Sequence, residues 1–352
     1  MRRSAKQRNV SAAKAKPAMP LRTKLMLAAA ALVLVVIDVL FGYYWFCLRD
    51  PAVGAAPGLP APGSTARPLP PSAIDILKPA PDPGFALDYS RAAHGTISGI
   101  PLTGRCSAGI LVDVDRRRVL WERNAHKSVP IASMTKMMTC LLLFERLDKE
   151  AANNPPKITL QTRLLVSRNA SRVGESSVYL RENEEFAIED YLKAVIIKSA
   201  NDAAFELGEF LGGGSIDNFV KMMNARAAEL GMKDTVYTSP NGLPNAKKEN
   251  CMASPHDLVL LANELLRHPY LDYSKLKGGK IRQMVYRTTN RLLSKVEGVD
   301  GLKTGFTNAA RSCITVSCLR NGRRMVLVLT GMPSGADRDN CAIKLLDWGY
   351  KH

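Results

Sequence analysis

The sequence predicts an α/β fold in which an antiparallel sheet carries an inserted helical subdomain. Residues 107–123 and 311–332 each read as two strands joined by a short turn, so strands occur near both ends of the folded part. Between them, apolar residues recur at three- and four-residue spacing, which is typical of helices. This order implies two lobes, and a cleft between two lobes is a natural binding site.

The first elements of the folded part, which begins near Asp88, are a hairpin and a buried helix. Residues 107–115 and 118–123 are strand-like and flank a short polar turn. The helix that begins at Ser133 is apolar almost all round after its first turn, which is the signature of a fully buried helix. Residues 157–232 then read as mainly helical.

The last elements are a helix, a hairpin and a closing helix. The helix begins after Ser254, whose hydroxyl suits the N-cap position. Residues 311–319 and 324–332 are strand-like and are joined through Asn321-Gly322, a pair that favours the type I′ turn of a hairpin. Residues 341–350 have the pattern of a C-terminal helix.

The N-terminal region predicts a membrane anchor and a spacer. Residues 1–24 hold eight basic residues and no acidic one, so we expect a cytoplasmic tail. Residues 25–48 are apolar apart from Asp38 and suit a transmembrane helix, whereas a cleaved signal peptide usually has an apolar core of about 7–15 residues. Residues 49–87 are rich in proline and predict an extended linker. We therefore expect residues 88–352 outside the cytoplasm, in the periplasm or at the cell surface.

Charge and cysteine content exclude several classes of protein. The net charge is +17, but the chain has no basic stripe interleaved with aromatic residues, so we expect no nucleic-acid partner. The charge instead suits anionic lipid or cell-wall polymer. No CxxC or Cys/His spacing indicates a metal or another cofactor. Cys313 and Cys318 lie five residues apart in one predicted strand, so they should face opposite ways and not form a disulfide with each other. We expect Cys140 to be a packed thiol rather than part of a disulfide, and the other possible pairings stay open.

Ser133 and Lys136 lie three residues apart at the start of the buried helix. Residues at this spacing share one helix face, so their side chains can touch. A serine hydroxyl needs an adjacent base to become a nucleophile, and none of the five histidines lies in a recognisable Ser-His-Asp context. Burial and a nearby positive charge lower the pKa of a lysine, which can then act as the base.

Two further motifs follow downstream. Ser199-Ala200-Asn201 precedes a predicted helix, and Lys303-Thr304-Gly305 lies on a predicted strand. Each motif alone has a structural explanation, as a helix cap or as a solvated strand with a glycine bulge. The presence of all three motifs, in this order and on these elements, favours a catalytic site.

With these motifs the sequence resembles the low-molecular-mass penicillin-binding proteins, which are serine-type D-alanyl-D-alanine carboxypeptidases. The S-x-x-K, S-x-N and K-T-G motifs are common to penicillin-binding proteins and serine β-lactamases. The more specific likeness lies in longer stretches such as "SANDAAFELGEF", "SPNGLP", "VDGLKTGFT" and "KLLDWGY". It covers roughly residues 105–350 and implies the β-lactamase/transpeptidase-like fold.

The resemblance implies catalytic roles for five residues. Ser133 attacks the carbonyl between the two terminal D-alanines of a peptidoglycan stem peptide, and neutral Lys136 accepts its proton. Ser199 passes a proton towards the departing D-alanine, and Asn201 hydrogen-bonds Lys136 and the substrate backbone. Lys303 holds Ser199 and keeps Lys136 deprotonated by repulsion.

The resemblance also implies how substrate and inhibitors bind. Thr304 binds the terminal carboxylate, and the backbone N–H groups of Ser133 and Phe306, the residue after Gly305, form the oxyanion hole. β-Lactams are then covalent inhibitors, and water releases the acyl-enzyme from a peptide substrate. No cofactor is implied.

The sequence departs from the family pattern at two places. Many members continue into a small β-rich domain and a C-terminal amphipathic helix, whereas this sequence ends at His352 and its N-terminal span is expected to anchor it. Some members carry an arginine just before an "NxLL" stretch, where it helps to hold the substrate carboxylate. Here Thr289 precedes the stretch and Arg291 lies inside it.

Three alternative functions remain open. A class A β-lactamase carries a glutamate in an E-x-x-L-N loop between its second and third motifs, and no such stretch occurs between Asn201 and Lys303. A DD-endopeptidase, which cuts cross-links, uses the same residues as a carboxypeptidase. A non-catalytic sensor of penicillin or wall peptide is disfavoured because all three motifs are intact.

Overall fold

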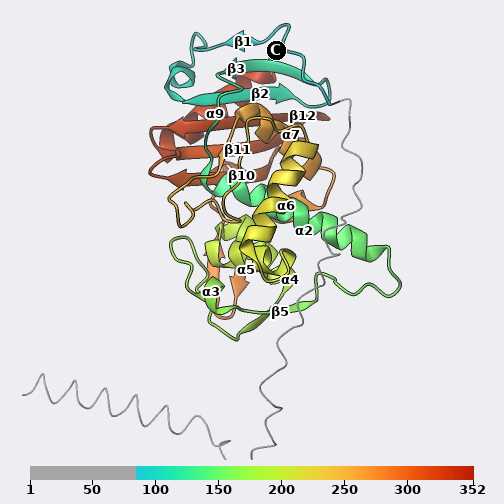
Figure 1. Cartoon of the computed structure of the whole chain (residues 1–352). Helices are drawn as coiled ribbons and strands as arrows, with labels where there is room; N and C mark the ends of the chain where they lie inside the picture. The colour runs from blue at the N-terminus through green and yellow to red at the C-terminus, as the bar shows by residue number, and fades with distance from the viewer. Residues whose placement is uncertain (1–84) are drawn as a thin grey trace, which may run out of the picture. The chain divides into compact units, whose positions relative to one another are not determined.

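A six-stranded sheet brings the two ends of the folded region together (Figure 1). The structure, a computed structural model, describes residues 85–352. Neighbouring strands pair antiparallel except β1 and β3, which are parallel, so the predicted antiparallel sheet is confirmed in its main part. The strand order is β1 (Ala93–His94), β3 (Arg118–Arg123), β2 (Ala108–Asp113), β12 (Arg323–Met332), β11 (Arg311–Arg320) and β10 (Val299–Thr307).

Both predicted hairpins are present in this sheet. β2 pairs with β3, and β11 pairs with β12. The turn between β11 and β12 has positive φ at both central residues, 51° at Asn321 and 72° at Gly322, as a type I′ turn requires. Cys313 packs into the core between the sheet and the inserted helices, and Cys318 packs into the core on the opposite face, which confirms that they face opposite ways.

Helices cover both faces of the sheet. α9 (Gly335–Gly349) packs against one face through Leu345 and Leu346. It begins earlier than predicted because the Ser334 hydroxyl caps it by accepting a hydrogen bond from the Asp337 backbone N–H. α7 (Pro255–Leu265) packs against the opposite face, and its predicted Ser254 N-cap is confirmed.

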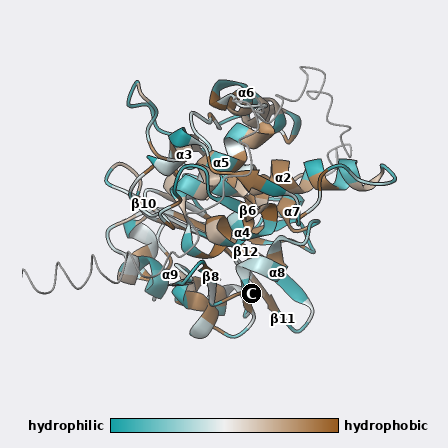
Figure 2. Ribbon diagram, turned by 90° about the horizontal axis from the view of Figure 1, so that it is seen from below, coloured by the Kyte–Doolittle hydropathy of each residue, from teal (hydrophilic) through white to brown (hydrophobic). Residues whose placement is uncertain are grey.

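The other helices form the inserted lobe below the sheet (Figure 1). α2 is fully buried from Met137 to Phe144, as predicted for the all-apolar helix. Figure 2 shows it brown towards the centre of the molecule and mixed with teal at its outer end. The lobe consists of α2 (Lys136–Ala151), α3 (Arg168–Ser171), α4 (Ile188–Lys193), α5 (Asn201–Leu211), α6 (Ile216–Glu229) and α8 (Tyr270–Ser274).

Two details of the lobe differ from the prediction. Ser133 lies in a 3-10 turn, η3 (Ala132–Thr135), and the α-helix itself begins at Lys136. The first part of residues 157–232 is not mainly helical, because β5 (Arg163–Leu165) pairs there with β6 (Glu185–Ala187). Two more short pairs were not predicted, since strands this short show no clear periodicity: β4 (Val129–Pro130) with β7 (Met252–Ala253), and β8 (Gly278–Ile281) with β9 (Met284–Arg287).

The structure tests the prediction for the cysteines, but the described residues do not include the predicted membrane anchor. The six cysteines within the described range are all free and buried, and this confirms the packed thiol at Cys140. None of the helices within residues 85–352 is long and apolar enough to cross a membrane. The predicted tail (1–24) and transmembrane helix (25–48) lie outside the described residues, as does nearly all of the linker (49–87).

Candidate active site

The side chains of Ser133 and Lys136 are in contact where η3 joins α2. Lys136 Nζ lies 2.8 Å from Ser133 Oγ, as the sequence spacing predicts. Lys136 is completely buried, whereas Ser133 is partly exposed. A hydroxyl group that a ligand can reach is therefore paired with an amine that water cannot reach.

The hydrogen bonds of Lys136 direct its lone pair. Nζ donates to Asn201 Oδ1 at 2.8 Å and to the carbonyl oxygen of Asn241 at 2.6 Å. Both partners can only accept, so they occupy the two N–H groups of a neutral amine. The remaining position on the nitrogen faces Ser133, and there the lone pair of a neutral Lys136 can accept the hydroxyl proton.

Two lysines are buried together at this site. Burial, followed by repulsion from Lys303, holds the pKa of Lys136 well below its ordinary value. Burial, together with the positive charge of the nearby Arg338, lowers the pKa of Lys303 to about 7. Burial of Lys136 and its repulsion by Lys303 both favour a neutral Lys136 at physiological pH.

The S-x-N motif is held by a loop from the lobe. Ser199 is buried and has a left-handed backbone (φ 65°) at the end of the π-turn η4 (Ala194–Lys198). The Asn201 backbone N–H donates to the Ser176 carbonyl at 2.6 Å, and its side-chain Nδ2 donates to the Gly174 carbonyl at 3.0 Å. These bonds turn Oδ1 of Asn201 towards Lys136.

The K-T-G motif lies on β10, which runs past η3. Lys303 Nζ donates to the Thr304 carbonyl at 3.0 Å, and Thr304 Oγ1 donates to Thr289 Oγ1 at 2.7 Å. The predicted contact of Lys303 with Ser199 is not among the hydrogen bonds of residues 85–352. The hydrogen bond from Thr304 places the Thr289 hydroxyl at the position where some family members have arginine.

Gly305 allows β10 to approach the nucleophile closely. A Cβ at this position would lie 2.9 Å from the Ile131 carbonyl oxygen and 3.3 Å from the Ser133 backbone nitrogen. A larger residue would push the strand away from the N–H group of Ser133. The exposed Phe306 follows directly, so the two predicted oxyanion-hole residues lie on adjoining segments.

Sequence reasoning missed the role of the loop at residues 239–242. The Asn241 carbonyl bonds Lys136, and the Pro240 carbonyl accepts a hydrogen bond of 2.6 Å from Thr139 Oγ1 on α2. Gly242 has φ +83°, and a Cβ there would overlap the Ala132 carbonyl oxygen. The Pro-Asn-Gly sequence signals a turn, but nothing in it indicates which carbonyl meets Lys136.

Backbone strain beside the nucleophile is a second unpredicted feature. Ala132 has φ 47°, a conformation that is unfavourable for a residue with a Cβ. Strain of this kind persists where surrounding contacts enforce it and is frequent at active sites. Here the Gly242 loop and β10 both pack against η3 and hold it.

Comparison with known proteins places this arrangement in a family. A family model described as D-alanyl-D-alanine carboxypeptidase, peptidase S11, matches residues 99–334. The chain belongs to this family. The D-alanyl-D-alanine carboxypeptidase DacF of Bacillus subtilis is 34% identical over 257 residues, which are 71% of this chain and 63% of the relative. DacC of Escherichia coli is 30% identical over 266 residues, which are 74% and 64% of the two chains. This peptidase S11 chain thus aligns with less than two thirds of either curated relative.

Solved structures confirm the predicted fold for this peptidase S11 member. Penicillin-binding protein D2 of Listeria monocytogenes, in its cefotaxime-bound form, is 29% identical with a TM-score of 0.62, and the match covers 70% of this chain and 97% of that one. Penicillin-binding protein 6B of Escherichia coli is 29% identical with a TM-score of 0.63, and the match covers 70% and 77%. The β-lactamase/transpeptidase-like architecture is therefore shared.

Proposed function

We propose that the chain is a serine D-alanyl-D-alanine carboxypeptidase, which removes the terminal D-alanine from peptidoglycan stem peptides. The observation that carries the proposal is the 2.8 Å contact of Ser133 Oγ with a buried lysine of depressed pKa. Its relatives DacF and DacC, which bear that activity in their names, support the choice of substrate.

Acylation follows from the geometry of the site. Ser133 Oγ gives its proton to Lys136 Nζ and bonds to the carbonyl carbon of the penultimate D-alanine. The developing oxyanion accepts hydrogen bonds from the backbone N–H groups of Ser133 and Phe306. The bond between the two D-alanines then breaks, and the proton passes from Lys136, with Ser199 as relay, to the amine of the departing D-alanine.

Deacylation uses the same groups in reverse roles. Departure of D-alanine opens space for a water molecule, whose proton goes to Lys136 as its oxygen attacks the ester. The bond between the acyl carbon and Ser133 Oγ then breaks, Oγ takes the proton back from Lys136, and the shortened peptide leaves. A β-lactam also acylates Ser133, but its leaving amine stays tethered to the acyl group and obstructs that water. Relatives described in cefotaxime-bound and ampicillin-bound forms support β-lactams as ligands.

The N-terminal sequence supports a location for this activity. The basic tail and the apolar stretch at residues 25–48 favour a single-pass membrane protein with residues 51–352 outside the cytoplasm. Peptidoglycan lies on that side of the membrane, so the proposed location and the proposed substrate agree.

The decisive experiment compares three substrates. The full-length protein is incubated with a stem pentapeptide, with a cross-linked dimer and with a fluorescent penicillin, and the products are identified by mass spectrometry. We expect repeated release of D-alanine from the pentapeptide and a penicilloyl-enzyme that persists for minutes or longer. Ser133→Ala should abolish both.

The other outcomes identify the alternatives. Preferential cleavage of the dimer indicates a DD-endopeptidase. Release of the penicilloyl group within a second, with no D-alanine from the peptide, indicates a β-lactamase. Acylation by penicillin without any turnover of peptide indicates a sensor.

A further inference from the structure

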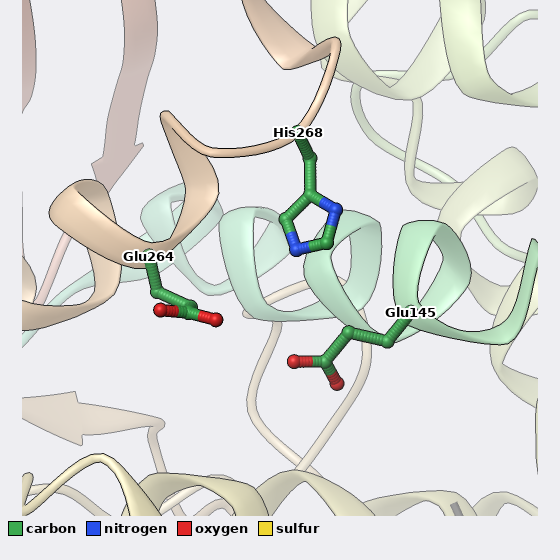
Figure 3. A group of neighbouring side chains, drawn as sticks. All are labelled: Glu145, Glu264 and His268. Carbon is green, nitrogen blue, oxygen red and sulfur yellow. The ribbon is translucent and has the colours of Figure 1, made fainter. Parts of the chain in front are cut away.

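Two glutamates and a histidine converge at the outer half of α2, about 13 Å along the helix axis from Lys136. Glu145 belongs to α2, Glu264 lies near the end of α7, and His268 follows that helix. One potential ligand atom from each side chain lies within 4.8 Å of the other two. Figure 3 shows the imidazole pointing into the space between the two carboxylates.

Two buried atoms of this cluster have no hydrogen-bond partner within the described part of the chain. They are Glu145 Oε2 and His268 Nε2. The two side chains are only 2% and 8% exposed, so bulk water does not solvate these atoms. An unpaired carboxylate oxygen beside an unpaired imidazole nitrogen is costly in an interior and points to a missing ligand.

The histidine is arranged as a metal-binding histidine usually is. His268 Nδ1 lies 3.0 Å from a carboxylate oxygen of Asp148, and the ring stacks on Phe144 with centroids 5.9 Å apart. When Nδ1, the nitrogen beside Asp148, carries the proton, the lone pair of Nε2 is free on the side of the cluster. A carboxylate on the far nitrogen is the usual partner of a histidine that binds metal.

The charges of the cluster favour a cation. Arg226 binds Glu145 Oε1 at 2.7 Å and Glu264 Oε1 at 3.2 Å, so one buried guanidinium serves two buried carboxylates. The second oxygen of Glu264 is bound at 3.0 Å by Arg267, whose side chain is half exposed and can move aside.

We propose that Glu145, Glu264 and His268 bind a divalent transition metal, with Zn²⁺ the best fit. One imidazole and two carboxylates form a ligand set that zinc accepts, and water completes the four positions. Zinc–ligand distances of about 2.0–2.2 Å require the three side chains to close by roughly 1 Å, which glutamate rotamers allow. The cysteine and histidine spacing did not indicate this site because its ligands come from α2 and from the end of α7.

Zinc at this position joins the helix that carries Lys136 to α7 and, through Arg226, to α6. It lies too far from Ser133 to take part in acyl transfer, so its effect is on stability. A ligand that binds only the folded state raises the melting temperature in proportion to the logarithm of its concentration over Kd.

The test measures zinc binding and melting without any activity assay. The full-length protein, freed of affinity tag and treated with chelator, is titrated with Zn²⁺ by calorimetry and melted with and without the ion. We expect one Zn²⁺ per chain and a melting temperature higher by about 5–10 °C at a hundredfold excess over Kd. His268→Gln and Glu145→Gln should lose both effects, and Asp148→Asn should weaken binding about 10–100-fold.

Glu229→Gln is the matched control. Glu229 also binds Arg226, at 3.3 Å, but is not one of the three ligands, so this variant should bind zinc as the wild type does. Circular dichroism of each zinc-free variant checks that it is folded. Absence of zinc binding by the wild type overturns the proposal in favour of a buried water or proton, and binding retained in both ligand variants places the ion elsewhere.

Discussion

Lys136 is the residue on which the proposed chemistry depends, because it must be neutral to accept a proton. Its burial provides this, and the carbonyls of Asn201 and Asn241 use up its two remaining N–H groups. An ordinary surface lysine is charged at neutral pH and could not serve as the base.

Replacing Lys136 by arginine tests this requirement. The guanidinium stays protonated, so Lys136→Arg should lower the rate of Ser133 labelling by fluorescent penicillin about 10²–10⁴-fold. The half-buried Lys193, which pairs with Glu189 at 3.0 Å, supplies the control Lys193→Arg, expected to label normally. An arginine variant at position 136 that labels at the wild-type rate would refute the assigned base.

Gly242 tests the loop that sequence reasoning missed. In Gly242→Ala the new Cβ overlaps the Ala132 carbonyl, so the loop must move and the Asn241 carbonyl leaves Lys136. We expect slower penicillin labelling together with a lower melting temperature. Gly231→Ala is the matched control, since φ is also positive (+75°) but a Cβ meets nothing within 4 Å. It should cost about 1–2 kcal/mol of stability and leave labelling unchanged.

At the scale of elements, α5 joins the catalytic motif to a buried acidic pair. Asn201 begins the helix, and further along it Glu206 accepts a 2.8 Å hydrogen bond from the Ser167 backbone N–H. Burial, together with the neighbouring Glu209, raises the pKa of Glu206 to about 7. Between about pH 4.5 and pH 7, Glu206 therefore keeps a proton in the folded state that it has released in the unfolded state.

The sign of the resulting pH dependence follows from that proton. The stabilising contribution of Glu206 is present below about pH 4.5 and is lost as the pH rises to about 7, by at most about 3 kcal/mol. Glu206→Gln keeps an acceptor for Ser167 and removes the titration, so its stability should change less between pH 5 and pH 8. Chemical denaturation at both pH values measures this, and identical changes in the two proteins would exclude Glu206 as the source.

At the scale of the whole molecule, the N-terminal sequence predicts topology. Residues 1–24 should stay in the cytoplasm and the catalytic domain outside it. Protease added to intact spheroplasts should therefore digest residues 88–352 and spare an N-terminal fragment. If the domain resists protease until the membrane is lysed, the predicted topology is wrong.

The sequence alone predicted the two hairpins of the sheet, the buried helix after Lys136 and the contact of Ser133 with Lys136. Asn321-Gly322 predicted its turn because a two-residue loop has few allowed conformations. The stretch after Lys136 predicted a buried helix because its periodicity is local. Ser133 and Lys136 could be paired directly, since a separation of three residues fixes their positions on one turn.

Only the tertiary structure decided which distant groups meet. Lys136 finds Asn201 and Asn241 through the packing of α2, α5 and a loop, and no local pattern contains that packing. Glu145 and His268 meet for the same reason, since they come from segments that pack side by side but lie far apart in the sequence. Such contacts depend on how whole surfaces fit together, whereas sequence patterns report only what a segment buries and where it turns.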